Sequence, residues 1–275
     1  MYWFARMDPS LDTSNGNNGK PDHAALYKGA LESIQAEGVE MLVGGAYALR
    51  HYAGVVRDTK DLDLFVRPKD LSPTLTALEK AGFRTNVPYP HWLAKGFAED
   101  RFIDVIFSSG NGLCVVDDEW FENGVAADVL GVDARLVPIE EMIWTKSFVM
   151  ERERFDGADV AHLLLASGEQ VHWPRLLERF GDNWRVLFAH LALFGFIYPH
   201  AREMIPGWVL QELSERVQME PTAATALRVC RGTLLSREQF LRDVREEGYL
   251  DARLKPLGAL TTSQLAPWSA EVEGR

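Results

Sequence analysis

The chain has 275 residues, of which 47% are hydrophobic and 25% are charged, enough for one large or two modest globular domains. Its formal net charge of −11 argues against a protein that coats nucleic acid broadly, because phosphate binding depends on lysine and arginine. Cys114 and Cys230 share no CxxC spacing, which disfavours a zinc site or a disulfide framework. No apolar run approaches the roughly 18 residues of a membrane span, and no secretory signal is evident, so we expect a cytoplasmic protein with no membrane association.

The first half of the chain alternates between helical and extended patterns. Residues 9–21 are rich in Ser, Asn, Gly and Pro, so residues 1–21 are predicted to form a flexible segment before the folded body. Hydrophobic periodicity then predicts helices over 22–36, 46–52 and 72–81, and strands over 39–43, 61–66, 101–107 and 113–116.

The second half has a helical texture punctuated by proline. Its periodicity predicts helices over 139–148, 156–166, 173–180, 183–194, 208–217 and 237–247. The stretch 261–275 is polar and is expected to fray. The predicted fold class is therefore α+β: a small mixed β-sheet with flanking helices, over 22–136, followed by an all-α C-terminal half, over 137–275.

Two carboxylates in the strand 61–66 are the first sign of chemistry. Residues two apart in a strand point to the same face, so Asp61 and Asp63 project together while Leu62 and Leu64 face the opposite layer. Two carboxylates facing the same way repel each other unless a cation lies between them, and Mg²⁺ prefers oxygen ligands. The pair is therefore a candidate metal site, although solvated strand faces also carry such pairs.

Two further features precede and follow this pair. Gly44-Gly45 joins a strand to a helix, where glycine lets the backbone turn sharply and the helix N-terminus offers free N–H groups to a phosphate. Asp104 interrupts an apolar strand, where a carboxylate is unfavourable unless it is paired or metal-bound. The alternative for Gly44-Gly45 is a plain tight turn between a strand and a helix. The alternative for Asp104 is an aspartate that faces outward on an edge strand.

The order of these three features resembles the signature of the polymerase-beta-type nucleotidyltransferase superfamily. Residues 41–66 look most like the bacterial toxin-type (abortive-infection class) and minimal nucleotidyltransferases, in which Gly-Gly-x-Ala-Leu precedes an Arg-x-Thr/Ser-x-Asp-x-Asp unit. That unit spans residues 57–63 here and includes Thr59. The spacer of 15 residues between Gly45 and Asp61 is a little longer than the superfamily's commonest form. The likeness weakens after residue 136 and ends near residue 170.

The resemblance implies a role for each matched residue. Residues 22–136 would be the catalytic domain, in which Asp61, Asp63 and Asp104 are catalytic and hold two Mg²⁺ ions, with Mn²⁺ as an alternative. The nucleotide-binding residues would be Gly44, Gly45, Thr59 and Lys146, with Asp159 orienting basic groups. The reaction would transfer NMP from an NTP to a hydroxyl acceptor with release of pyrophosphate.

The acceptor is open at this level: an RNA end such as tRNA, a protein, or a small molecule. Glu140 and Glu141 are candidates to activate it, although they resemble surface charges. His91 and Trp92 lie in an aromatic and basic loop that could stack a base or an acceptor, but an ordinary hydrophobic loop is the preferred interpretation. The alternative function is a non-catalytic nucleotide-binding or partner-binding module of a toxin–antitoxin-like system, with a cognate antitoxin as partner.

Overall fold

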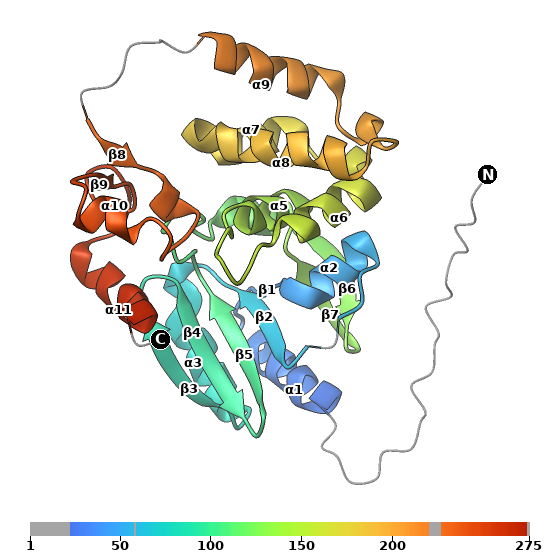
Figure 1. Ribbon diagram of the computed structural model, residues 1–275. Coiled ribbons are helices and arrows are strands. Elements are labelled where there is room, and N and C mark those ends of the chain that lie inside the picture. Colours follow the sequence, from blue (N-terminus) through green and yellow to red (C-terminus); the bar gives the residue numbers. More distant parts are fainter. Residues whose placement is uncertain (1–22, 58, 220–226, 274–275) are drawn as a thin grey trace.

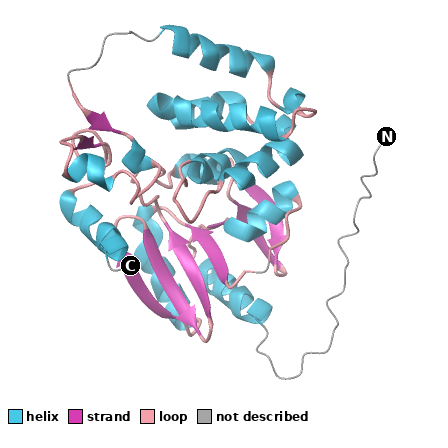
Figure 2. Ribbon diagram, viewed as in Figure 1, coloured by secondary structure: helices cyan, strands magenta, loops and turns pink. Residues whose placement is uncertain are grey.

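The computed structural model describes residues 23–57, 59–219 and 227–273 (Figure 1). The segment 1–21, predicted to be flexible, lies outside these described residues, as does Asp58. The chain forms a mixed β-sheet with helices packed on it, followed by a stack of helices (Figure 2). This arrangement confirms the predicted fold class.

The sheet in the described residues has seven strands, Leu42–Val43 (β1), Asp61–Phe65 (β2), Arg84–Tyr89 (β3), Leu93–Ala98 (β4), Arg101–Ile106 (β5), Val125–Val129 (β6) and Val132–Leu136 (β7). Their order is β3-β4-β5-β2-β1-β7-β6. The central strand β2 runs parallel to β5 and antiparallel to β1. The parallel pairing of β2 and β5 matters most, because it places their aspartates side by side.

The two faces of β2 have opposite characters. Leu62 and Leu64 are fully buried in the hydrophobic core, to which helices α1 (His23–Ala36) and α3 (Leu71–Lys80) also contribute (Figure 1). Asp61 and Asp63 alternate with these leucines and point to the other face. Helix α2 (Gly45–Ala53) begins on that second face, directly after β1.

The second half of the chain stacks helices outward from the sheet (Figure 1). Helices α5 and α6 lie nearest the sheet, α7 and α8 pack on them, and α9 forms the outermost layer. The helices after α3 are Asp118–Glu122 (α4), Ile139–Ser147 (α5), Gly157–Ser167 (α6), Trp173–Phe180 (α7), Trp184–Ile197 (α8), Gly207–Met219 (α9), Leu241–Arg245 (α10) and Thr262–Glu273 (α11). Over the parts of the chain that the structure covers, none of them has both the length and the apolar character needed to cross a bilayer.

The C-terminal segment, residues 227–273, returns from the helical stack to the sheet (Figure 1). It contains a short parallel pair, Val229–Cys230 (β8) and Leu250–Asp251 (β9), within the half that the sequence predicted to be all helical. Helix α11 then packs against β3 at the edge of the sheet. The predicted domain boundary near residue 136 stays a prediction.

Several elements differ from the sequence prediction. The strand predicted over 113–116 is wrong: the N–H groups of Leu113 and Cys114 donate to the side chains of Asn111 and Ser109, so they do not pair with a neighbouring strand. The stretch from 261, expected to fray, forms α11. Four strands of the seven-stranded sheet were not predicted, namely β3, β4, β6 and β7.

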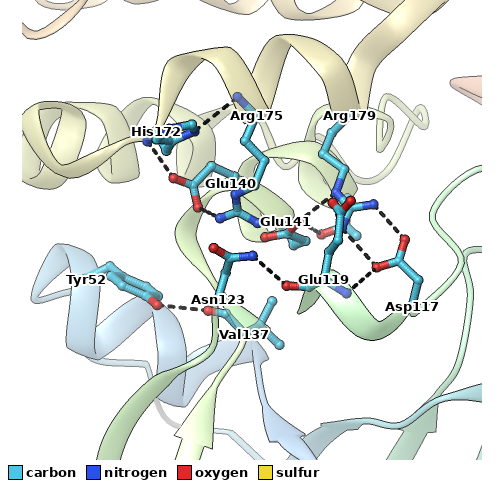
Figure 3. A network of polar contacts seen from close by, with 11 residues as sticks. Tyr52, Asp117, Glu119, Asn123, Val137, Glu140, Glu141, His172, Arg175 and Arg179 are labelled. Atoms are coloured by element: carbon cyan, nitrogen blue, oxygen red, sulfur yellow. Dashed lines mark hydrogen bonds and ion pairs between the residues drawn. The ribbon is translucent and has the colours of Figure 1, made fainter. Parts of the chain in front are cut away.

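A buried ion-pair network joins α5 to α7 (Figure 3). Arg175 donates to Glu141 at 2.6 Å and also to Glu140, while the backbone N–H of His172 donates to Glu140 at 2.6 Å. Arg179 bridges Glu141, at 3.0 Å, to the loop before α4. Glu140 and Glu141, considered above as acceptor-activating groups or surface charges, are instead buried and line neither cavity described below.

Removing one cation from this network should destabilise the protein strongly. We expect Arg175→Met to lower the free energy of unfolding by about 3 kcal/mol, because buried Glu140 loses its ion-pair partner and buried Glu141 keeps only Arg179. The matched control is Arg216→Met, which breaks a half-exposed pair with Glu212 one helical turn away and should cost less than about 1 kcal/mol. Urea unfolding of both variants measures the difference, and equal small losses would contradict a structural role.

Candidate active site

The turn between β1 and α2 brings the backbone against an aspartate. The N–H of Gly44 donates to the carbonyl of Asp63 at 2.9 Å. Gly45 has a φ of +53°, and a Cβ built on it would lie 1.7 Å from Oδ2 of Asp63. Only glycine fits a position that combines left-handed backbone with such a close approach. The two glycines therefore let the N-terminus of α2 sit directly against the Asp63 carboxylate.

The three predicted aspartates converge on one face of the sheet. In the parallel pairing of β2 with β5, Asp63 lies opposite Asp104, and Asp61 precedes Asp63 by two residues on the same face. One carboxylate oxygen from each lies within 4.8 Å of the others. Such a set of hard oxygen donors suits a divalent cation of the Mg²⁺ type.

The electrostatics of this triad are unfavourable without a cation. Burial, together with the charges of Asp61 and Asp104, raises the pKa of Asp63 to about 7, against smaller opposing effects of Lys146 and Arg154. Burial also raises the pKa of Asp104, although an ion pair with Lys95 opposes the change. Neutralising such a cluster is what a bound divalent ion does, so the donor set fits a metal.

Lys95 is a site residue that the sequence prediction missed. It lies opposite Asp104 in the antiparallel pairing of β4 with β5, and its Nζ is 2.6 Å from Oδ1 of Asp104. Glu99-Asp100 forms a two-residue turn before β5 but lacks the glycine typical of such a turn, so the sequence carries only a weak signal for this hairpin. A hairpin closed there places Lys95 across from Asp104.

A small basic cavity of about 180 Å³ adjoins the triad. Gly45, Asp63 and Thr59 line it together with the cations Arg57, Lys146 and Arg154. The hydroxyl of Thr59 donates to the Asp61 carboxylate, so this residue holds a triad member in addition to lining the cavity.

Asp159 organises two of these cations, as the resemblance implied. Lys146 Nζ lies 2.8 Å from Asp159 Oδ2, and Arg57 donates to both oxygens of the same carboxylate. Burial alone would disfavour the charged carboxylate, but the hydrogen bonds from Arg57 and Lys146 hold its pKa below the usual range. The cations are thus fixed toward a space that suits an anion.

A larger cavity of about 510 Å³ opens on the other side of Asp63. It shares Gly45, Asp63, Lys146 and Arg154 with the small cavity and extends past the ends of β2 and β5 to the C-terminal segment. Trp92, predicted to lie in an ordinary loop, lines it. The triad carboxylate Asp63 therefore lies where a basic cavity and a larger, mixed cavity meet.

Comparisons with known proteins find structural likeness only. No protein-family model matches the sequence, and no curated protein does. The crystal structure of ANT(2'')-Ia in complex with adenylyl-2''-tobramycin is similar, with 15% identity and a TM-score of 0.43, covering 59% of this chain and 98% of that one. The crystal structure of the lincosamide antibiotic adenylyltransferase LnuA with bound lincomycin is also similar, with 15% identity and a TM-score of 0.38. The match covers 54% of this chain and 98% of that one.

A third similar structure is an antigenic nucleotidyltransferase-like protein from Paracoccidioides brasiliensis, with 13% identity and a TM-score of 0.35, covering 60% of this chain and 93% of that one. At this level of similarity, the chemistry of this chain has to be inferred from its own residues. These three solved structures are nucleotidyltransferases or a protein described as nucleotidyltransferase-like.

Proposed function

We propose that this protein is a magnesium-dependent nucleotidyltransferase, which transfers NMP from an NTP to an acceptor hydroxyl and releases pyrophosphate. One observation carries the proposal. Three carboxylates converge within 4.8 Å of one another beside a glycine turn, and a basic cavity adjoins them. Metal ligands and phosphate-binding groups are therefore adjacent, as nucleotide transfer requires.

The triad and the basic cavity would have different roles, the first in binding metal and the second in binding phosphate. Asp61, Asp63 and Asp104 would hold Mg²⁺, in the expected case two ions, which when bound stabilise the attacking and leaving oxygens. The backbone at Gly44 and Gly45 and the side chains of Lys146, Arg57 and Arg154 would hold the phosphates and offset their charge.

The reaction itself is an exchange of one P–O bond for another. The acceptor oxygen forms a bond to the α-phosphorus while the bond from that phosphorus to the oxygen bridging to the β-phosphate breaks. The departing pyrophosphate lies among the cations of the basic cavity. Asp104 would accept the hydroxyl proton, with Lys95 holding one of its two oxygens in place.

The alternative of a binding module without turnover is less well supported. A module that only binds nucleotide has no need of three partly buried, mutually repelling carboxylates, in which burial and the charge of Asp61 raise the pKa of Asp63 and of Asp104 at a cost to the fold. Association with a cognate antitoxin, the choice of NTP and residence in the cytoplasm stay predictions.

Incubation with each α-labelled NTP, Mg²⁺ and mixed acceptors tests the proposal. We expect transfer of label that requires Mg²⁺ and is lost in Asp61→Ala, but is retained in the control Asp133→Ala on the exposed side of β7. Nucleotide binding without transfer under any condition would favour the binding module. Absence of nucleotide binding would exclude both functions.

A further inference from the structure

The larger cavity has its own chemistry, distinct from that of the basic cavity. We propose that it is the acceptor site, and that the acceptor is a small, neutral or cationic molecule that carries a hydroxyl group and an apolar face. This inference rests on the proposed function and names its substrate class. The size of the cavity, the segment that closes it and the groups that line it all favour such a molecule.

The size and position of the cavity suit a small molecule. Its volume of about 510 Å³ lies within the range of roughly 300–1,000 Å³ that small-molecule pockets occupy. It reaches Asp63 and Lys146 at one end, so a hydroxyl group placed there would face the triad. Of the cations assigned to the phosphates, Arg57 lines only the small cavity, whereas Lys146 and Arg154 line both and mark the end where the two cavities meet.

The far wall of the cavity is a fixed part of the C-terminal segment. Asn111 Nδ2 donates to the carbonyl of Leu234 at 2.8 Å, joining this segment to the loop after β5. Glu151 accepts from the hydroxyl of Ser236 at 2.5 Å and from the backbone N–H of Arg237 at 3.0 Å, joining it to the loop after α5. These bonds close a side of the active site that would otherwise be open, which limits the length of a bound acceptor.

An aromatic cluster from two distant parts of the chain stands at this wall. Trp268 of α11 packs edge-on against Trp92 and Tyr89 of the β3–β4 hairpin, with ring centroids 4.9 and 5.0 Å apart. Trp268 also lies against the backbone of Gly110, where an added Cβ would come within 2.6 Å of its ring. Both tryptophans line the cavity, so they offer rigid apolar surface to a ligand.

The charges of the lining disfavour a polyanion. Within the described residues, the side chains of Glu153 and Glu238 have no hydrogen-bond or ion-pair partner, and both line the cavity. One cation of the lining, Arg152, is likewise unpaired among the described residues. The unpaired charge of the lining is therefore negative even without the triad, which a bound cation neutralises, and this suits an amine and disfavours an RNA end.

The test compares acceptors and then variants. Wild-type protein, labelled NTP and Mg²⁺ are incubated separately with lincomycin, tobramycin, a short RNA with a free 3′ hydroxyl group, and mixed protein. We expect label on a small probe and none on RNA or protein. Label on RNA or protein would overturn the acceptor class, and so would the absence of label on every probe while the nucleotide binds. Loss of Mg²⁺-dependent nucleotide binding would instead mark failure of the proposed function.

The variants then locate the acceptor. Trp268→Ala should raise the KM for the labelled small probe about 10-fold with little change in kcat, because it removes one apolar wall. Trp268→Phe should keep a KM near the wild-type value, which separates loss of the wall from misfolding of α11. The matched control is Trp208→Ala, a half-exposed tryptophan of α9 outside the cavity, which should change neither value. A raised nucleotide Kd in Trp268→Ala with an unchanged acceptor KM would overturn the proposal, because the cavity would then hold the nucleotide base.

Discussion

Replacing Asp63 with asparagine is expected to reduce nucleotide transfer by more than about 1,000-fold while the protein stays folded. Asp63 is the central member of the triad: it lies opposite Asp104, touches the turn at Gly45 and lines both cavities. Asparagine keeps the size of the side chain but removes its charge and replaces one carboxylate oxygen with an amide nitrogen. Transfer of label from an NTP measures the loss, and full Mg²⁺-dependent activity in this variant would contradict the assignment.

The same substitution should stabilise the protein in the absence of metal. The pKa of Asp63 is raised to about 7 in the folded protein, whereas an unfolded aspartate titrates near 4. Between these two values the folded state binds more protons than the unfolded state, so this group makes stability fall as the pH rises from about 4 to about 7, and the loss persists above that range. Asparagine has no such titration. We therefore expect Asp63→Asn to gain on the order of 2 kcal/mol over wild type at about pH 8, and little at about pH 4.

Addition of Mg²⁺ provides the control. A cation that binds only the folded wild-type protein stabilises it according to its concentration and affinity, and the variant should gain less. Thermal unfolding with a chelator and with Mg²⁺, at both pH values, gives the four measurements needed. If the stability of wild type and of Asp63→Asn depended on pH in the same way in the presence of chelator, the charge of Asp63 would not be what destabilises the metal-free protein.

The sequence was sufficient to predict most of the face that carries the three aspartates. Two-residue periodicity placed Asp61 and Asp63 on one side of a strand, and the position of Asp104 within an apolar run marked a second strand. The long helices of the second half were also predicted, since their apolar periodicity extends over several turns. In each case the pattern of apolar residues lies within one strand or helix, so it predicts that element without knowledge of the strands or helices that pack against it.

The parts that could not be predicted depend on contacts between distant residues. Strand β3 contains Pro88 and is largely exposed, so its sequence reads as a loop and only pairing with β4 makes it a strand. Glu140 and Glu141 resemble surface charges until α7 brings Arg175 against them. The return of the C-terminal segment to the sheet, which places Trp268 beside Trp92, has no signal at all in the local pattern.

Replacing Gly45 with alanine should reduce transfer by about 100-fold or more, because the new Cβ would collide with the Asp63 carboxylate that the turn supports. The substitution carries two separate penalties. One is the strain of an L-residue at a φ of +53°, of roughly 1–2 kcal/mol, and the other is the collision at 1.7 Å from Oδ2.

A substitution at Gly54 separates these two penalties. Gly54 ends α2 with a φ of +66°, and no atom lies within 4 Å of a Cβ added to it. Gly54→Ala bears the backbone strain alone, so it should lose a comparable amount of stability and keep its transfer activity. Urea unfolding and label transfer in both variants distinguish the effects. Equal activity in the two alanine variants would mean that the contact between Gly45 and Asp63 is structural. Loss confined to Gly45→Ala would show that activity depends on how closely α2 approaches the triad.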